Sequence, residues 1–304
     1  MSSILHQVPS EIQIRIRREL KRLVFGKTMF CPHCQYSGIK KHETRYRCKR
    51  CRKWFSLTSV TWLKGTKLPL ETIWLILWCW LKKVPQDQAM KLSGVSRPTL
   101  GAWYAKFRNH LPQDHFLNIR LGQKIQIDEA YRGHYSIIGA KQVGTRNIAL
   151  EYLPKNSVDR SDAVNFLSQY VIPNSNLCSD GASIYQKINN WWPVNHQFER
   201  HNQNQFKITS EIEGLWGTYF TFIRRMYHHI AQDQVPSILN EFTLRFSKPQ
   251  YFVNPAQYLE ISLPKLKRPQ PKLWINIFKK NFEIKTPQLS LISKLNLIMP
   301  SPFR

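Results

Sequence analysis

Apolar residues recur at helical spacing through the first third of the chain. Residues 1–26 predict a short amphipathic helix, with an apolar face made of Ile12, Ile16, Leu20 and Leu23. The run "KLPLETIWLILWCW" predicts a second helix, because Pro69 and Glu71 suit a first turn. Its two tryptophans one turn apart, Trp74 and Trp78, form a stripe that is typical of a buried core.

The next apolar positions predict two helices joined by a tight turn, within residues 66–118. A short helix ends near Leu92, Ser93 and Gly94 make the turn, and a second helix begins at about Arg97. This is the spacing of a helix-turn-helix unit, whose second helix enters the major groove of DNA. The residues expected to face DNA are Arg97, Thr99 and Lys106, and those expected to face inward are Leu100, Trp103 and Phe107.

The pattern changes to strand-like alternation at Lys124. The segments "KIQIDEAY", "YSIIGAKQVG" and "NIALEYLP" follow one another with turn residues between them and predict three strands. A helix over about residues 161–171, a short strand ending at Asp180, a strand in "HQFER" and a long helix in "TSEIEGLWGTYFTFIRRMYHHI" complete the order. This order predicts an α/β domain with the mixed sheet of the ribonuclease-H-like class over residues 122–247. The Pro- and Lys-rich residues 248–304 are expected to form an extended basic arm.

The charge of the chain narrows its partners to polyanions. Its 304 residues carry 45 Lys and Arg against 19 Asp and Glu, a formal net charge of +26. Nucleic acid is the usual polyanion for such a chain. A structural protein of the ribosome type and a binder of membrane surfaces are the alternatives. Because the charge is spread over the whole chain rather than confined to a tail, nucleic acid is favoured.

No segment of the sequence predicts export or membrane insertion. The N-terminus lacks the apolar core of a secretory signal. The most apolar run, Ile73–Leu81, is far shorter than the roughly 20 residues that span a bilayer. We therefore expect no membrane partner, and a location with the nucleoid in the cytoplasm of a bacterium or in the nucleus of a eukaryote. Either location keeps cysteines reduced.

Four of the six cysteines fall in one window, "CPHCQYSGIKKHETRYRCKRC", within residues 27–62. Two CxxC pairs about a dozen residues apart suit tetrahedral thiolate coordination of zinc. The expected ligands are Cys31, Cys34, Cys48 and Cys51. So small a segment has no core of its own, so zinc is expected to be structural and to supply folding energy. His33 and His42 are expected to be solvated, and Cys79 and Cys178 to be buried apolar residues.

Carboxylates on separate elements offer a second site. Cleavage of a phosphodiester with two metal ions needs carboxylates that meet at one point, and magnesium prefers such hard oxygen ligands. Asp128 lies on the first predicted strand and Asp180 at the end of the fourth, and two such strands can be neighbours in a mixed sheet. Glu213 or Glu211, on the long helix, can then reach across as the third ligand. Adjacent strand residues point to opposite faces, so only one of Asp128 and Glu129 is expected at the site, and the alternation does not decide between them.

The ordered motifs resemble those of bacterial insertion-sequence transposases that join an N-terminal zinc ribbon to an ISXO-type DDE catalytic domain, to which eukaryotic Merlin elements are related. The matching pieces, which cover roughly residues 25–250, are "CPHC", "CKRC", "CRKWFS", "KLPLETIW", "SGVSRPTL", "IDEAYRG", "SDGASIY", "SEIEGLW" and "YHHI". The resemblance implies a ribonuclease-H-like fold that uses two Mg²⁺ or Mn²⁺ ions to cut double-stranded DNA at transposon ends and to join those ends to target DNA. It also implies that the ribbon and the helix-turn-helix recognise terminal inverted repeats, within a dimer or larger assembly.

Carried over by position, Asp128 and Asp180 match the first and second aspartates of the family. At the third position, Ser210 stands where the family commonly has Asn, while Glu213 lies in a matching "IE..W" element. We therefore take Glu213 as the third metal ligand, with Glu211 in reserve.

The rest of the long helix departs from the family at one place and matches it at another. Phe220 stands where a lysine usually follows the tryptophan, and two arginines come further on. The paired histidines match those of the family. The expected DNA contacts of this region are Arg224, Arg225, His228 and His229. The alternative to an active DNA transposase is a catalytically decayed copy that acts as a non-enzymatic DNA-binding protein.

Overall fold

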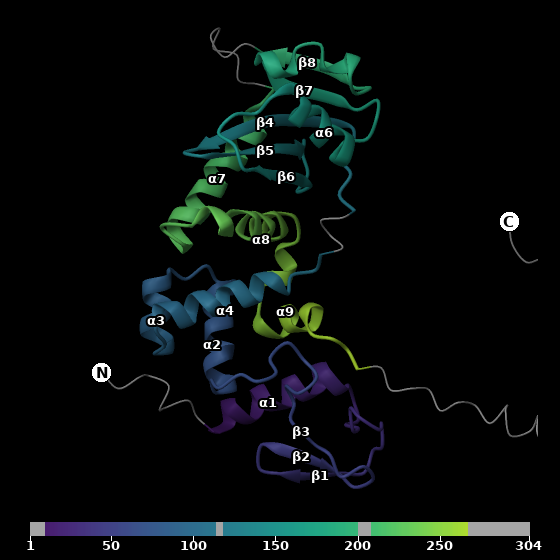
Figure 1. Cartoon of the computed structure of the whole chain (residues 1–304), viewed down its shortest axis with the longest axis vertical. Helices are drawn as coiled ribbons and strands as arrows, with labels where there is room; N and C mark the ends of the chain where they lie inside the picture. The colour runs from purple at the N-terminus through teal and green to yellow at the C-terminus, as the bar shows by residue number, and fades with distance from the viewer. Residues whose placement is uncertain (1–9, 114–117, 200–207, 267–304) are drawn as a thin grey trace, which may run out of the picture.

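The computed structural model describes residues 10–113, 118–199 and 208–266, and Figure 1 shows them stacked along one long axis. A five-stranded sheet lies at one end, a small three-stranded sheet lies at the other, and a group of helices lies between them. One continuous hydrophobic cluster runs from the first helix through the ribbon and the middle helices to one face of the large sheet. No helix in the described ranges is both long and apolar enough to cross a membrane.

The N-terminal part pairs a helix with a small antiparallel sheet of order β1-β2-β3. Its elements are α1 (Ser10–Phe25), β1 (Ile39–His42), β2 (Arg45–Cys48) and β3 (Trp54–Phe55). The predicted apolar face of α1 holds from Ile16 onward, where Leu20 and Leu23 are buried against the ribbon and the helices that follow. Ile12 differs from the prediction, because it is 48% exposed at the free end of the helix.

Three helices form the middle layer: α2 (Leu70–Leu81), α3 (Gln86–Ser93) and α4 (Arg97–Asn109). Gly94 ends α3 in the left-handed conformation, at a φ of 68°, which glycine adopts without strain. The inward side chains Leu100, Trp103 and Phe107 are buried as predicted.

The stripe of Trp74 and Trp78 was expected to form the core face of α2. Trp74 is only partly buried against the core, and Trp78 points away from it. Trp78 is 40% exposed, whereas Trp80 is completely buried together with Ile76 and Leu77. The helix is apolar nearly all round, so spacing alone did not identify the side that packs against α4 and the C-terminal helix.

The large sheet has the strand order β6-β5-β4-β7-β8. Its strands are β4 (Lys124–Arg132), β5 (Tyr135–Gln142), β6 (Ile148–Leu153), β7 (Asn176–Asp180) and β8 (Asn195–Glu199). β5 pairs antiparallel with both of its neighbours, while β7 and β8 run parallel to β4. Numbered within the domain this is the order 3-2-1-4-5 with the second strand reversed, which confirms the ribonuclease-H-like mixed sheet.

Helices cover both faces of this sheet, as Figure 1 shows. The elements involved are α6 (Arg160–Tyr170) on one face, and α7 (Ser210–Met226) and α8 (Val235–Ser247) on the other. Ile125 and Ile127 of β4 pack on the α6 face together with Leu177 of β7. By alternation the even-numbered residues of β4 point to the α7 face, where Gln126 accepts a hydrogen bond of 2.8 Å from the backbone N–H of Ile212.

The segment after α8 corrects the prediction of an extended arm from residue 248. Residues 249–262 contain η6 (Pro249–Phe252) and α9 (Pro255–Ser262), which pack against α1, α2 and α8. Tyr258 is completely buried and donates a hydrogen bond of 2.8 Å to the carbonyl of Phe107. The sequence concealed this helix because its few apolar residues stand among prolines and polar residues. The remaining residues predicted as arm, 267–304, lie outside the described ranges.

A buried ionic cluster ties the middle helices to the large sheet. Glu241 of α8 is completely buried, and its carboxylate accepts a 2.7 Å bond from the Nε of Arg245 and a 2.6 Å bond from the hydroxyl of Tyr227. Arg108 of α4 lies 3.8 Å from the same carboxylate. Arg245 also donates to the carbonyl oxygens of Trp80 and Leu81 at the end of α2. One carboxylate therefore links α2, α4, the end of α7 and α8.

Replacing Glu241 by Gln should lower the free energy of unfolding by about 3–5 kcal/mol, because two guanidinium groups would remain buried without a counter-charge. Urea denaturation of the purified chain measures this change. The matched control is Glu260→Gln, since Glu260 forms an exposed ion pair with Lys265 at 3.6 Å. That change should cost less than about 1 kcal/mol. Equal small effects of both substitutions would show that the buried cluster does not stabilise the fold.

Candidate catalytic and metal sites

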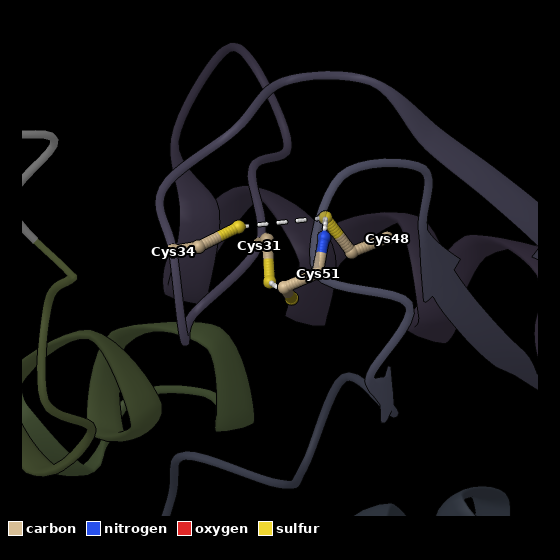
Figure 2. A group of neighbouring side chains, drawn as sticks. All are labelled: Cys31, Cys34, Cys48 and Cys51. Carbon is tan, nitrogen blue, oxygen red and sulfur yellow. Dashed lines mark hydrogen bonds between the residues drawn. The ribbon is translucent and has the colours of Figure 1, made fainter.

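The four predicted zinc ligands come together in the ribbon. Their sulfur atoms all lie within 4.8 Å of one another, and this is the one group of three or more His, Cys, Asp or Glu ligand atoms so close among the described residues. The Cys31 and Cys51 Sγ atoms are 3.6 Å apart, and those of Cys34 and Cys48 are 3.5 Å apart (Figure 2). A tetrahedron with Zn–S bonds of about 2.3 Å needs S–S separations of about 3.8 Å. The cluster therefore fits a zinc ribbon.

Backbone N–H groups stabilise the thiolate form of Cys48 in the second cysteine pair. The N–H groups of Arg50 and Cys51 donate to the Sγ of Cys48 at 3.4 and 3.5 Å. Against the opposing effect of burial, these bonds and those with the thiols of Cys34 and Cys51 lower the pKa of Cys48 to about 6. A thiolate is the form that binds zinc.

Asp128 and Asp180 lie on neighbouring strands of the large sheet. Asp128 is in the middle of β4, and Asp180 is the last residue of β7. The parallel pairing of β4 with β7 matches Lys124 with Asn176 and Gln126 with Cys178. Asp128 and Asp180 are the residues two positions further along each strand, and the charge of Asp180 contributes to the raised pKa of Asp128. Paired residues of adjacent strands are roughly 5 Å apart. Two carboxylates from distant parts of the chain therefore lie on adjacent strands near the middle of the sheet.

Trp216 of α7 fixes the carboxylate of Asp128. Its indole Nε1 donates a hydrogen bond of 2.9 Å to Asp128 Oδ2. The indole lies close to the sheet because Gly139, the β5 residue opposite Asp128, has no side chain. A Cβ atom at Gly139 would come within 2.7 Å of both Trp216 and Leu150. Sequence reasoning missed this pair, and the only signal was a glycine inside an otherwise apolar strand.

Glu129 contributes a third negative charge that the sequence did not assign. It lies on the opposite face of β4, where it accepts hydrogen bonds from the hydroxyls of Tyr185 at 2.6 Å and Tyr131 at 3.2 Å. Burial, together with the charges of Glu129 and Asp180, raises the pKa of Asp128 to about 7. Burial and the Asp180 charge likewise raise the pKa of Glu129, although the two tyrosine hydroxyls oppose this. The middle of β4 thus carries two neighbouring carboxyl groups, one on each face of the sheet, whose pKa values are both raised.

The two candidate glutamates of α7 point to different flanks of the helix. Glu211 forms an ion pair with Lys141 and accepts bonds of 3.1 and 3.2 Å from the Gly144 N–H, at the β5–β6 turn. The Lys141 ammonium lowers the pKa of Glu211. Glu213 is about 200° further round the helix, on the flank away from that turn, and accepts a 2.9 Å bond from the Thr209 hydroxyl. Glu211 is therefore held at the β5 side of the helix, away from the flank that carries Glu213. The three predicted metal ligands, Asp128, Asp180 and Glu213, do not form a cluster within 4.8 Å in the described structure.

The residues predicted to contact DNA fall into two groups. In the helix-turn-helix, Arg97 pairs with Asp87, and the hydroxyl of Thr99 lies 2.9 Å from that of Ser96. Lys106 is half-buried, with its ammonium 5.0 Å from the ring centroid of Trp103. The group at the end of α7 is exposed and consists of Arg224, Arg225, His228 and His229.

Comparison with known proteins gives a family for the large domain. Residues 112–247 match the family model of the ISXO2-like transposase domain. No curated protein sequence matches the chain.

Two solved structures resemble the fold weakly. One is a chain of the simian T-cell lymphotropic virus intasome in complex with the PP2A regulatory subunit B56 gamma, with 12% identity, coverage of 64% of this chain and 76% of that chain, and a TM-score of 0.33. The other is the HTLV-2 integrase catalytic core domain in complex with magnesium, with 8% identity, coverage of 42% and 88%, and a TM-score of 0.30. Likeness at these scores does not bear on function.

The raised pKa of Asp128 predicts a stabilising substitution. The folded state holds the Asp128 proton up to about pH 7 whereas the unfolded chain releases it near pH 4, so this carboxyl destabilises the fold as pH rises between those values. In magnesium-free buffer at pH 8, Asp128→Asn should raise the free energy of unfolding by roughly 1–3 kcal/mol, with no gain below about pH 4.

The measurement is a set of urea denaturation curves across this pH range. Asp233→Asn is the matched control, because Asp233 is exposed in the short helix η5 (Gln232–Gln234). It should leave stability unchanged at every pH. An Asp128→Asn chain less stable than the parent at pH 8 would mean that the bond from Trp216 outweighs the repulsion.

Proposed function

We propose that the ISXO2-like transposase domain of this chain catalyses strand cleavage at transposon ends and transfer of those ends to target DNA. The observation that carries the proposal is the placement of Asp128 and Asp180 on adjacent parallel strands, beneath a helix that offers Glu213. The family match and the net charge of +26 support a DNA substrate. Two or more chains would hold the paired ends, since strand transfer joins both ends to one target.

The donor set fits divalent cations. Carboxylate oxygens are hard ligands of the kind that Mg²⁺ and Mn²⁺ prefer. Burial, together with the negative charges of Glu129 and Asp180, raises the pKa of Asp128, and a bound cation would offset this cost. Asp128, Asp180 and Glu213 would hold two ions. When bound, such ions supply an activated water and stabilise the attacking and leaving oxygens of an in-line displacement.

The neighbouring groups orient these carboxylates. Trp216 fixes one oxygen of Asp128, and the backbone N–H of Ala182 donates to Asp180 Oδ1 at 3.1 Å. Thr209 fixes Glu213 at the start of α7. Each carboxylate therefore keeps a second oxygen or lone pair for a cation, and its orientation does not have to be set when DNA arrives.

Positive side chains near the same helix would bind the DNA backbone. Arg224 and Arg225 are exposed in the last turn of α7 and suit phosphate contacts. Phe220 stands at the position of the usual lysine, but Arg132 at the end of β4 lies over its ring, 5.5 Å from the centroid. A cation is thus present beside this position, although it comes from another element.

Substitution of the carboxylates tests the catalytic proposal. With a labelled transposon end and magnesium, Asp128→Ala and Asp180→Ala should each reduce cleavage at least about 100-fold, because residues that merely orient a metal ligand already contribute 10- to 100-fold. Asp233→Ala should cleave at the parental rate. Cleavage unchanged by either aspartate substitution would overturn the assignment.

A paired substitution separates the two glutamates of α7. Glu213→Gln should reduce cleavage to the same extent as the aspartate changes, whereas Glu211→Gln should retain activity and lose the ion pair with the buried Lys141. The reverse result would make Glu211 the third ligand.

A non-catalytic DNA-binding protein is the second candidate. It is favoured by Ser210 at the third family position and by the three predicted ligands lying apart in the described structure. The purified chain would then bind transposon ends with unchanged affinity in the carboxylate variants and cleave none of them.

We also propose that the four-cysteine cluster holds structural zinc. Cys48→Ser should release one zinc ion per chain and unfold the ribbon, because α1 and the ribbon share buried side chains around the cysteines. Metal analysis and proteolysis of the N-terminal part measure both effects. Cys79→Ser is the control, since Cys79 is buried in α2 far along the chain from the cluster. Retained zinc in Cys48→Ser would refute the ligand assignment.

A further inference from the structure

The outward face of the ribbon sheet collects cations around one exposed tryptophan. Across the three strands, Lys40 pairs with Arg47 and Arg47 pairs with Trp54, while His42 pairs with Arg45. These five residues share one side of the sheet by alternation, and we call this side the ribbon face. The other side turns toward α1, where Tyr46 stacks on Phe55 at 5.6 Å and Phe55 contacts Phe25.

Trp54 is held in place yet open to solvent. Its side chain is 41% exposed, and the ring of His42 packs against it with centroids 4.8 Å apart. The guanidinium groups of Arg45 and Arg47 lie 5.4 and 5.6 Å from its ring centroid. Both distances are within the roughly 6 Å to the centroid that is typical of a cation–π contact. Because both arginines are exposed, they can turn toward phosphates and leave the ring free.

An open hollow beside the tryptophan extends the positive surface. It measures about 410 Å³ and is lined by Lys40, Arg47, Cys48, Lys49 and Arg52. No carboxylate lines it. The nearest acidic residue in sequence, Glu43, lines a separate hollow next to α1. The hollow and the ribbon face therefore form one surface with five cations, suited to a run of phosphates.

We propose that the ribbon face binds an unpaired DNA strand, with one base stacked on Trp54 and the adjoining phosphates held by Arg45, Arg47 and the hollow. An exposed aromatic ring flanked by cations is the combination by which proteins hold single strands. The bases of an intact duplex stack on one another, so their faces are closed to an external ring. This binding does not require the catalytic chemistry, and a chain with inactive carboxylates would retain it.

Affinity for oligothymidine and for a duplex of equal length tests the proposal. The zinc-loaded full-length chain is titrated into each labelled DNA by fluorescence anisotropy in magnesium-free buffer. Trp54→Ala should weaken single-strand binding about 5- to 100-fold, the range for one stacked base, and change duplex binding by less than about 2-fold. Trp54→Phe should restore most of the loss. The matched control is Trp191→Ala, which removes another exposed tryptophan, 64% exposed, from the large domain and should change neither affinity.

A second measurement keeps the test independent of folding. Zinc content confirms an intact ribbon in each variant, and the double change Arg45→Gln with Arg47→Gln should reduce the salt dependence of single-strand binding by about 1.4 in log–log slope. Equal losses on single strand and duplex in Trp54→Ala would show a general phosphate contact and overturn the stacking proposal. Unchanged single-strand affinity with zinc retained would overturn the site altogether. Because cleavage is not measured, these outcomes are separate from failure of the proposed catalytic function.

Discussion

Parallel pairing of β4 with β7 is the constraint on which the candidate catalytic site depends. Antiparallel neighbours can be joined by a short turn, but two parallel strands need a crossover, here supplied by α6. The crossover places residues 52 positions apart, Asp128 and Asp180, at the same level of adjacent strands. Register is critical, because a slip of one residue would turn one carboxylate to the opposite face. The apolar residues Ile125, Ile127 and Leu177 prevent such a slip, since they must remain against α6.

The site is costly to the fold in the absence of a cation. Burial and mutual repulsion oppose ionisation of Asp128, and the surrounding bonds only partly offset this cost. Trp216 supplies one such bond and requires Gly139 to approach the sheet closely. Residues selected for stability alone would not include three carboxylates at the centre of a basic chain. The cost of ionising Asp128 would be offset by the bound cations of the proposed function.

The sequence predicted the elements well and their faces less well. Alternation located the strands that carry Asp128 and Asp180, because period-two patterns survive in any half-buried sheet. The same alternation did not choose between Asp128 and Glu129, since that choice depends on which face α7 covers. Glu211 and Glu213 lie on different flanks of one helix, and their partners differ. Glu211 contacts Lys141 on β5, which is distant in sequence. Tertiary contacts of this kind leave no local signature.

The buried charges also could not be predicted from local sequence. They connect the middle helices to the large sheet. Glu241 and Arg245, four residues apart, resemble a solvated surface pair in sequence, yet both are buried because α2 and α4 close over them. Their contacts join the middle helices to the large sheet, and the shared hydrophobic cluster continues to the ribbon. A DNA contact at the ribbon would therefore raise the effective concentration of the same DNA at every other contact on the chain.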